Sequence, residues 1–151
     1  MAAMVFMYIE ALGRPLAAEM ALGFVKDGEW RVSTADKVYA FVHLYMPELW
    51  TALERFEDRK HILADTYRNG LVHEIFMKGD AAIHECLIGK KDYVREGQAG
   101  CPVSIEWGML ANEFRAALRA YQQRLQTDSV FAAIYNDPAC YAKTRLAKAA
   151  R

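Results

Sequence analysis

Apolar residues recur at steps of three and four along most of the chain, the spacing of helices that bury one face. The clearest case is the segment from residue 33 to about Met46, where Ser33 or Thr34 can cap the amino-terminal end. The apolar positions that define its buried face are Val38, Phe41, Val42 and Tyr45. This pattern predicts one amphipathic helix.

Two shorter helices are predicted before that segment. The first covers Met4 to Leu12 and stops at Gly13, because glycine is a common residue just past the end of a helix. The second covers residues 15–25, because the proline at position 15 is tolerated in a first helical turn. Asp27-Gly28 then predicts a turn.

The pattern changes in the middle of the chain. From Pro47 to about Met77 it stays helical, with a break predicted near Glu57-Asp58. Glycines and short apolar runs then follow, and they predict a Gly-rich loop or a small β-hairpin around residues 78–103.

The second half of the chain returns to helical spacing. Ser104 with Trp107 predicts the start of a long helix that runs to about Gln126. Asp128 is expected to cap a shorter helix that ends near Tyr135. The fold class is therefore mostly α, a helical bundle in which residues 1–151 form a single domain with a basic C-terminal tail at 138–151.

Composition is that of a soluble globular protein, with 54% hydrophobic and 25% charged residues among 151. No apolar run approaches the roughly 20 residues that span a bilayer, so no membrane partner is expected. The apolar opening has no basic stretch before it and predicts a core helix rather than a secretory signal. The three cysteines are odd in number and lack CxxC spacing, which favours reduced thiols and a cytoplasmic location.

The net charge is zero but unevenly distributed. From Glu113 onward seven basic residues face three acidic ones, a net +4, which leaves −4 for the preceding part of the chain. A basic C-terminal portion can contact a phosphate backbone, and a solvated helix face explains the same bias.

A polar stripe follows one side of the helix predicted from Lys60 to Phe76. Leu63, Tyr67, Leu71 and Ile75 recur on the side expected to face the core. The opposite side carries, at every fourth position, His61, Asp65, Asn69 and His73. A merely solvated helix face usually mixes Lys and Glu, so this composition indicates a functional surface.

Arg68 and His73 supply the chemistry that a phosphodiester requires. The guanidinium of Arg68 is a permanently charged fork suited to phosphate oxygens, and an imidazole can act as acid or base near neutral pH. Asn69 can orient His73 from one turn away, and Asp65 can pair with Arg68. Five positions on a regular helix correspond to about 140° of rotation, so Arg68 and His73 do not converge within one chain. We therefore expect a homodimer with a composite site, unless Gly70 distorts the turn.

The sequence around this motif, from Tyr67 to Glu74, resembles the Arg-x-x-x-x-His signature of the HEPN superfamily, and especially small bacterial HEPN-like proteins. Two further segments agree with it, at residues 9–14 and 103–118. The resemblance implies an all-α bundle that dimerises and, in active members, cleaves RNA without a metal ion or other cofactor.

Carried over to this chain, the resemblance makes His73 the general base or acid at a ribose 2′-hydroxyl. Arg68 would stabilise the charge on the phosphate, and Asn69, Asp65 and His61 would support them. RNA and an antitoxin or other partner protein are the expected partners, in a defence or toxin–antitoxin setting. The alternative is a non-catalytic dimeric interaction module in which the same stripe forms the interface.

Other chemistry-bearing residues have weaker patterns. His84 and Cys86, with His73 and Glu74 upstream, match no zinc spacing, so no metal site is predicted. His43 lies among apolar residues and is expected in the core or an interface. The three tryptophans, Trp30, Trp50 and Trp107, are better explained as core or interface aromatics than as base-stacking platforms. Gly89-Lys90 lacks the remainder of a P-loop.

Overall fold

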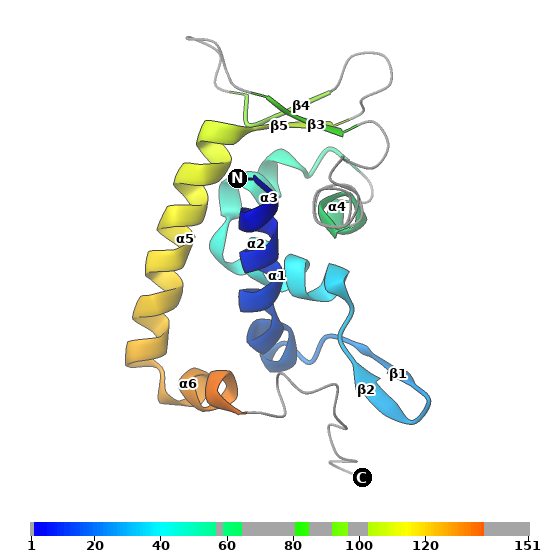
Figure 1. Cartoon of the computed structure of the whole chain (residues 1–151), viewed down its shortest axis with the longest axis vertical. Coiled ribbons are helices and arrows are strands. Elements are labelled where there is room, and N and C mark those ends of the chain that lie inside the picture. The colour runs from blue at the N-terminus through cyan, green and yellow to red at the C-terminus, as the bar shows by residue number, and fades with distance from the viewer. Residues whose placement is uncertain (1, 57–58, 65–80, 85–91, 97–102, 138–151) are drawn as a thin grey trace.

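The computed structural model describes residues 2–56, 59–64, 81–84, 92–96 and 103–137, and it confirms a mostly helical fold. The helix α1 lies at the centre of the molecule and α5 runs along one side of it (Figure 1). A three-stranded sheet crosses one end of α5, and α6 follows its other end. The helices are α1 (Ala2–Glu19), α2 (Thr34–Tyr45), α3 (Pro47–Ala52), α4 (Arg59–His61), α5 (Trp107–Thr127) and α6 (Ser129–Asn136).

The first helix is longer than predicted. A single helix, α1, replaces the two helices expected at 4–12 and 15–25, and it passes through both Gly13 and Pro15. The reason for Gly13 is a close approach between helices, because a Cβ added there would lie 1.9 Å from the carbonyl oxygen of Lys37 in α2. Gly13 therefore serves the packing of α1 on α2 rather than ending a helix.

A β-hairpin occupies the end of the predicted second helix. Strand β1 (Phe24–Lys26) pairs antiparallel with β2 (Glu29–Arg31). The turn predicted at Asp27-Gly28 is confirmed, and both of its residues have positive φ, 55° and 75°. Two positive φ values in a two-residue loop suit the twist of a tight hairpin.

The predicted helix after Ser33 is confirmed. Ser33 caps α2 through a capping box, in which its hydroxyl accepts from the amide of Asp36 and the Asp36 carboxylate accepts from the Ser33 amide. Pro47 begins α3 as predicted, but α3 ends at Ala52, earlier than the break expected near residues 57 and 58. The chain becomes helical again at α4, and residues 62–64 continue it with wider helical turns.

The glycine-rich region contains more β-structure than a hairpin. Strands β4 (Val94–Glu96) and β5 (Val103–Glu106) pair antiparallel, and β3 (Ala81–His84) pairs parallel to the other edge of β5. The central strand β5 is buried along its whole length. The parallel pairing joins residues about twenty positions apart, so no local pattern could indicate it.

Strand β5 also corrects the predicted start of the long helix. Ser104 lies in the strand, and α5 begins at Trp107 with Glu106 as its cap, whose carboxylate accepts from the amides of Gly108 and Met109. The end of α5 near Gln126 and the Asp128 cap of α6 agree with the prediction. The basic tail at 138–151 lies outside the described residues.

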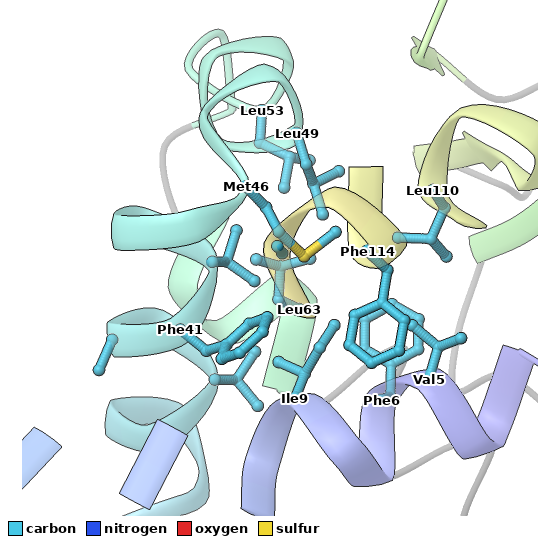
Figure 2. Packing of buried hydrophobic residues seen from close by; sticks show 14 of the residues in the cluster. Val5, Phe6, Ile9, Phe41, Met46, Leu49, Leu53, Leu63, Leu110 and Phe114 are labelled. Atoms are coloured by element: carbon cyan, nitrogen blue, oxygen red, sulfur yellow. The ribbon is translucent and has the colours of Figure 1, made fainter. Parts of the chain in front are cut away.

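One hydrophobic core joins these elements. Phe6 and Ile9 of α1 point toward Phe114 of α5 and Phe41 of α2, and Figure 2 shows Leu63 among them. All but Phe114 are 0% exposed, and Phe114 is 7% exposed. Within the described ranges, no helix has the length and apolar character needed to cross a membrane.

Candidate functional site

Most of the predicted site residues fall in the part of the chain that is not described. Arg68, Asn69, His73 and Asp65 all lie in residues 65–80. His61 is the one member of the polar stripe inside the described ranges, and it is the exposed last residue of α4. The described structure therefore defines how the chain enters the motif, and which side chains surround that entry.

The entry to the motif is fixed to the core. Leu63 and Ala64 are 0% and 1% exposed, and Leu63 belongs to the hydrophobic core. Only residues 65–67 separate this buried anchor from Arg68. The prediction that Leu63 faces the core is confirmed, and it places the start of the predicted functional segment against the bundle.

An ion pair also holds α4 to α2. Lys60 of α4 donates through Nζ to the Oδ1 atom of Asp36, the residue that completes the capping box of α2. Burial opposes the ionisation of Asp36, but hydrogen bonds from Lys60 and Ser33 outweigh it and hold the pKa of Asp36 below its ordinary value. Asp36 is therefore a buried carboxylate whose charge is compensated by its neighbours.

Beside this ion pair lies an aromatic–cation cluster, formed by Tyr39, His43, Trp50, Arg59 and Lys60. Tyr39 and His43 are one turn apart on α2 and stack with ring centroids 5.1 Å apart and planes inclined by 15°. The guanidinium carbon of Arg59 lies 3.8 Å from the ring centroid of Trp50. The Lys60 ammonium lies 5.5 Å from the ring centroid of Tyr39. Both contacts are within the range of cation–π attraction.

Trp50 completes the aromatic part of this cluster. Its ring centroid is 5.2 Å from that of Tyr39 and 5.5 Å from that of His43, and it stands edge-on to both. With the 5.1 Å stack these distances form a nearly equilateral triangle, so Tyr39 and Trp50 approach His43 from neighbouring directions. His43 is exposed, which corrects the expectation of a core position, while an interface position stays a prediction.

Arg59 keeps hydrogen-bonding capacity in this cluster. Its Nη1 atom lies 3.5 Å from the carbonyl oxygen of Trp50 and 3.7 Å from the Oε1 atom of Glu54, a carboxylate whose side chain is 69% exposed. The Arg59 side chain is itself 27% exposed. A guanidinium carries five N–H donors, and both of these contacts use Nη1, so within the described part of the chain Arg59 keeps donors that can bind an anion.

The other two tryptophans do not join the cluster. Trp107 opens α5 and packs half-buried against the hydrophobic core, as predicted for a core aromatic. Trp30 lies in β2, where a Cβ added to Gly23 would lie 2.8 Å from its indole nitrogen. Trp50 is half-buried and serves both packing and the cluster.

A second group of polar residues, in which Tyr93 is buried and Glu113 is partly buried, joins α3, α5 and the chain entering β4. Glu113 of α5 accepts from the amides of Glu48 and Leu49, at 2.7 and 3.1 Å, and so caps the start of α3. Burial raises the pKa of Glu113, although these hydrogen bonds lower it in part. Among the described residues the buried Tyr93 hydroxyl has no hydrogen-bond partner of ordinary geometry, and burial followed by the charge of Glu113 raises its pKa. The hydrogen bonds from the amides of Glu48 and Leu49 to Glu113 hold the start of α3 against α5.

Metal ligands do not gather in the described part of the chain, where no three His, Cys, Asp or Glu side chains could share an ion. Of the residues weighed for a metal site, His73, Glu74 and Cys86 lie outside the described ranges, and His84 lies in β3.

Sequence reasoning missed three members of the cluster, namely Tyr39, Arg59 and Lys60. The spacing of Tyr39 and His43 could have placed these two on one helical face. The approach of Arg59 to Trp50 depends on the turn that follows α3, and the local sequence pattern does not predict that contact.

Comparison with protein-family models, curated proteins and solved structures returned no match. The residues that indicate a function are therefore those of the motif and those around its entry.

Proposed function

We propose that this chain is a HEPN-like, metal-independent endoribonuclease that acts as a homodimer. The observation that carries the proposal is the sequence Arg68-Asn69-Gly70-Leu71-Val72-His73, which supplies a phosphate-binding cation and a titratable imidazole. The aromatic–cation cluster supports it, because planar rings and cations are the groups that bind unpaired RNA, and its two cations belong to α4, shortly before the motif in the chain.

In the proposed reaction His73 removes the proton from a ribose 2′-hydroxyl. The 2′-oxygen attacks the adjacent phosphorus and the bond from phosphorus to the 5′-oxygen breaks. Arg68 stabilises the negative charge that develops on the phosphate oxygens, and the departing 5′-oxygen takes up a proton from water. Asn69 and Asp65 orient His73 and Arg68, and His61 extends the same polar surface. The products are a 2′,3′-cyclic phosphate and a 5′-hydroxyl.

The test is cleavage of a mixed RNA pool by the purified protein in EDTA, followed by analysis of the new ends. Wild type should produce cyclic phosphate ends, and His73→Ala and Arg68→Ala should each lose about a hundredfold in rate. Arg115→Ala, which removes an exposed arginine of α5, is the matched control and should cleave normally. Cleavage by His73→Ala at the wild-type rate, or no cleavage by any of the proteins, would rule out the nuclease.

A second function, that of a non-catalytic dimeric interaction module, is favoured by one surface of α1. Met4, Met7 and Tyr8 are 56%, 51% and 53% exposed and lie on one helical face, opposite the buried Phe6 and Ile9. Exposed apolar side chains grouped in this way are typical of an interface. Met7→Lys should then weaken self-association in sedimentation, with Arg115→Lys as a control, and unchanged association would count against this surface.

A further inference from the structure

We infer that the aromatic–cation cluster is a subsite that stacks one unpaired nucleobase on His43 and binds the neighbouring phosphate through Arg59. This inference rests on the proposed function, since it gives the ribonuclease a second RNA contact outside the motif. It predicts that the RNA substrate is single-stranded where it contacts α2.

The stacking surface follows from the ring geometry. His43 is held parallel to Tyr39 and edge-on to Trp50, so its orientation is fixed by two aromatic neighbours while the ring stays exposed. A ring that is already ordered loses little conformational entropy when a ligand stacks on it. A nucleobase added to His43 would extend the Tyr39–His43 stack by one member.

The phosphate contact follows from the position of Arg59. Its guanidinium carbon lies 3.8 Å from the centroid of the Trp50 ring, and within the described ranges its contacts with Trp50 and Glu54 both use the Nη1 atom, so other N–H donors remain for a phosphate. Lys60 adds a second positive charge within 5.5 Å of the Tyr39 ring, although its ammonium is bound to Asp36. The cluster therefore combines one exposed ring with one available cation, as a base and its phosphate require.

Glu54 gives this subsite a distinguishing property. Its exposed carboxylate pairs with Arg59 and competes with a phosphate for the same guanidinium. Removal of this charge should therefore strengthen binding, whereas removal of the His43 ring should weaken it. If the surface bound RNA only through non-specific charge, removal of the His43 ring would not change the affinity.

The experiment measures fluorescence anisotropy of a labelled, unpaired oligoribonucleotide in EDTA, with every variant made in a His73→Ala background so that the probe stays intact. His43→Ala should weaken binding about tenfold and His43→Phe should restore it, because stacking needs only a flat ring. Glu54→Gln should tighten binding roughly threefold. A duplex of the same sequence should bind more weakly than the single strand.

The control is Phe24→Ala, which removes a 46% exposed aromatic side chain from the β-hairpin and should leave binding unchanged. Equal binding by His43→Ala and its parent overturns the subsite, as does equal affinity for duplex and single strand. If either of these results is obtained while the wild-type protein cleaves RNA, the subsite is rejected and the nuclease proposal is retained. Absence of both binding and cleavage removes both proposals.

Discussion

Asp36 is the residue that connects the best-predicted helix to the entry of the functional motif. Its carboxylate completes the capping box with Ser33 and accepts from Lys60 of α4. Its side chain is only 11% exposed, so loss of either partner would leave a poorly solvated charge. One side chain thus couples the start of α2 to the position of α4.

Replacement of Asp36 by alanine should lower the free energy of unfolding by about 2 kcal/mol at neutral pH, because a capping interaction and the ion pair are lost together. The folded-state pKa of Asp36 is lowered, so this contribution is complete above the unfolded pKa of about 3.9 and is lost as the pH falls through the folded value. Denaturant unfolding at several pH values should show wild type and Asp36→Ala converging in acid. A difference that stays constant down to that range would contradict this account.

Glu113 has the opposite pH dependence. Its folded-state pKa is raised, chiefly by burial, so its stability contribution is present below the unfolded value of about 4.3 and is lost as the pH rises through the folded value. Glu113→Gln keeps an acceptor for the amides of Glu48 and Leu49 without a partly buried charge. This variant should gain stability relative to wild type as the pH rises from 4 to 7, whereas Glu113→Ala should lose about 1 kcal/mol at pH 7 through the missing cap. Thermal unfolding at pH 4 and pH 7 measures the stability of both variants relative to wild type. If wild type became more stable relative to Glu113→Gln as the pH rose, the raised pKa of Glu113 would be contradicted.

At the scale of elements, local signals predicted the helices that carry their own caps and apolar faces. Ser33 and Asp128 marked the starts of α2 and α6 because capping is a contact between residues three apart. Gly13 misled the prediction, since its small size serves the contact with Lys37 rather than a helix end. The same limit applies to the candidate site: residue types indicated the chemistry of the motif, but the cluster joins α2, α3 and α4 through the turn at residues 53–56.

Gly13→Ala tests the helix packing directly. Alanine favours an isolated helix by about 1 kcal/mol, but its Cβ would meet the Lys37 backbone at 1.9 Å and would separate α1 from α2. We expect a net loss of about 2 kcal/mol in the free energy of unfolding, measured with denaturant. Gly108→Ala is the control, because the atoms nearest to its Cβ belong to the end of the Glu106 side chain, at 3.2 Å. A gain in stability for Gly13→Ala would show that α1 and α2 tolerate the added methyl group.

For the whole molecule, the main consequence is that the proposed site needs side chains from more than one chain. Helical spacing turns Arg68 and His73 about 140° apart, so a regular helix cannot direct both at one phosphate. The described structure offers an exposed apolar face on α1 for association, and the entry to the motif is anchored by Leu63 and the Asp36–Lys60 pair. A composite site built from two such anchored segments would be positioned by both cores at once.

Mixing two inactive variants distinguishes a composite site from a site within one chain. If each site takes Arg68 from one subunit and His73 from the other, a heterodimer of Arg68→Ala and His73→Ala has one site with both residues missing and one with both present. Random exchange makes half of the dimers heterodimers, so an equal mixture should recover about a quarter of the wild-type rate per subunit. Sites contained within single chains would each lack one residue, and the mixture would stay as inactive as its components. The rate should be measured in EDTA after unfolding and refolding the two variants together, with each variant refolded alone as the control, because only subunit exchange can then produce the recovery.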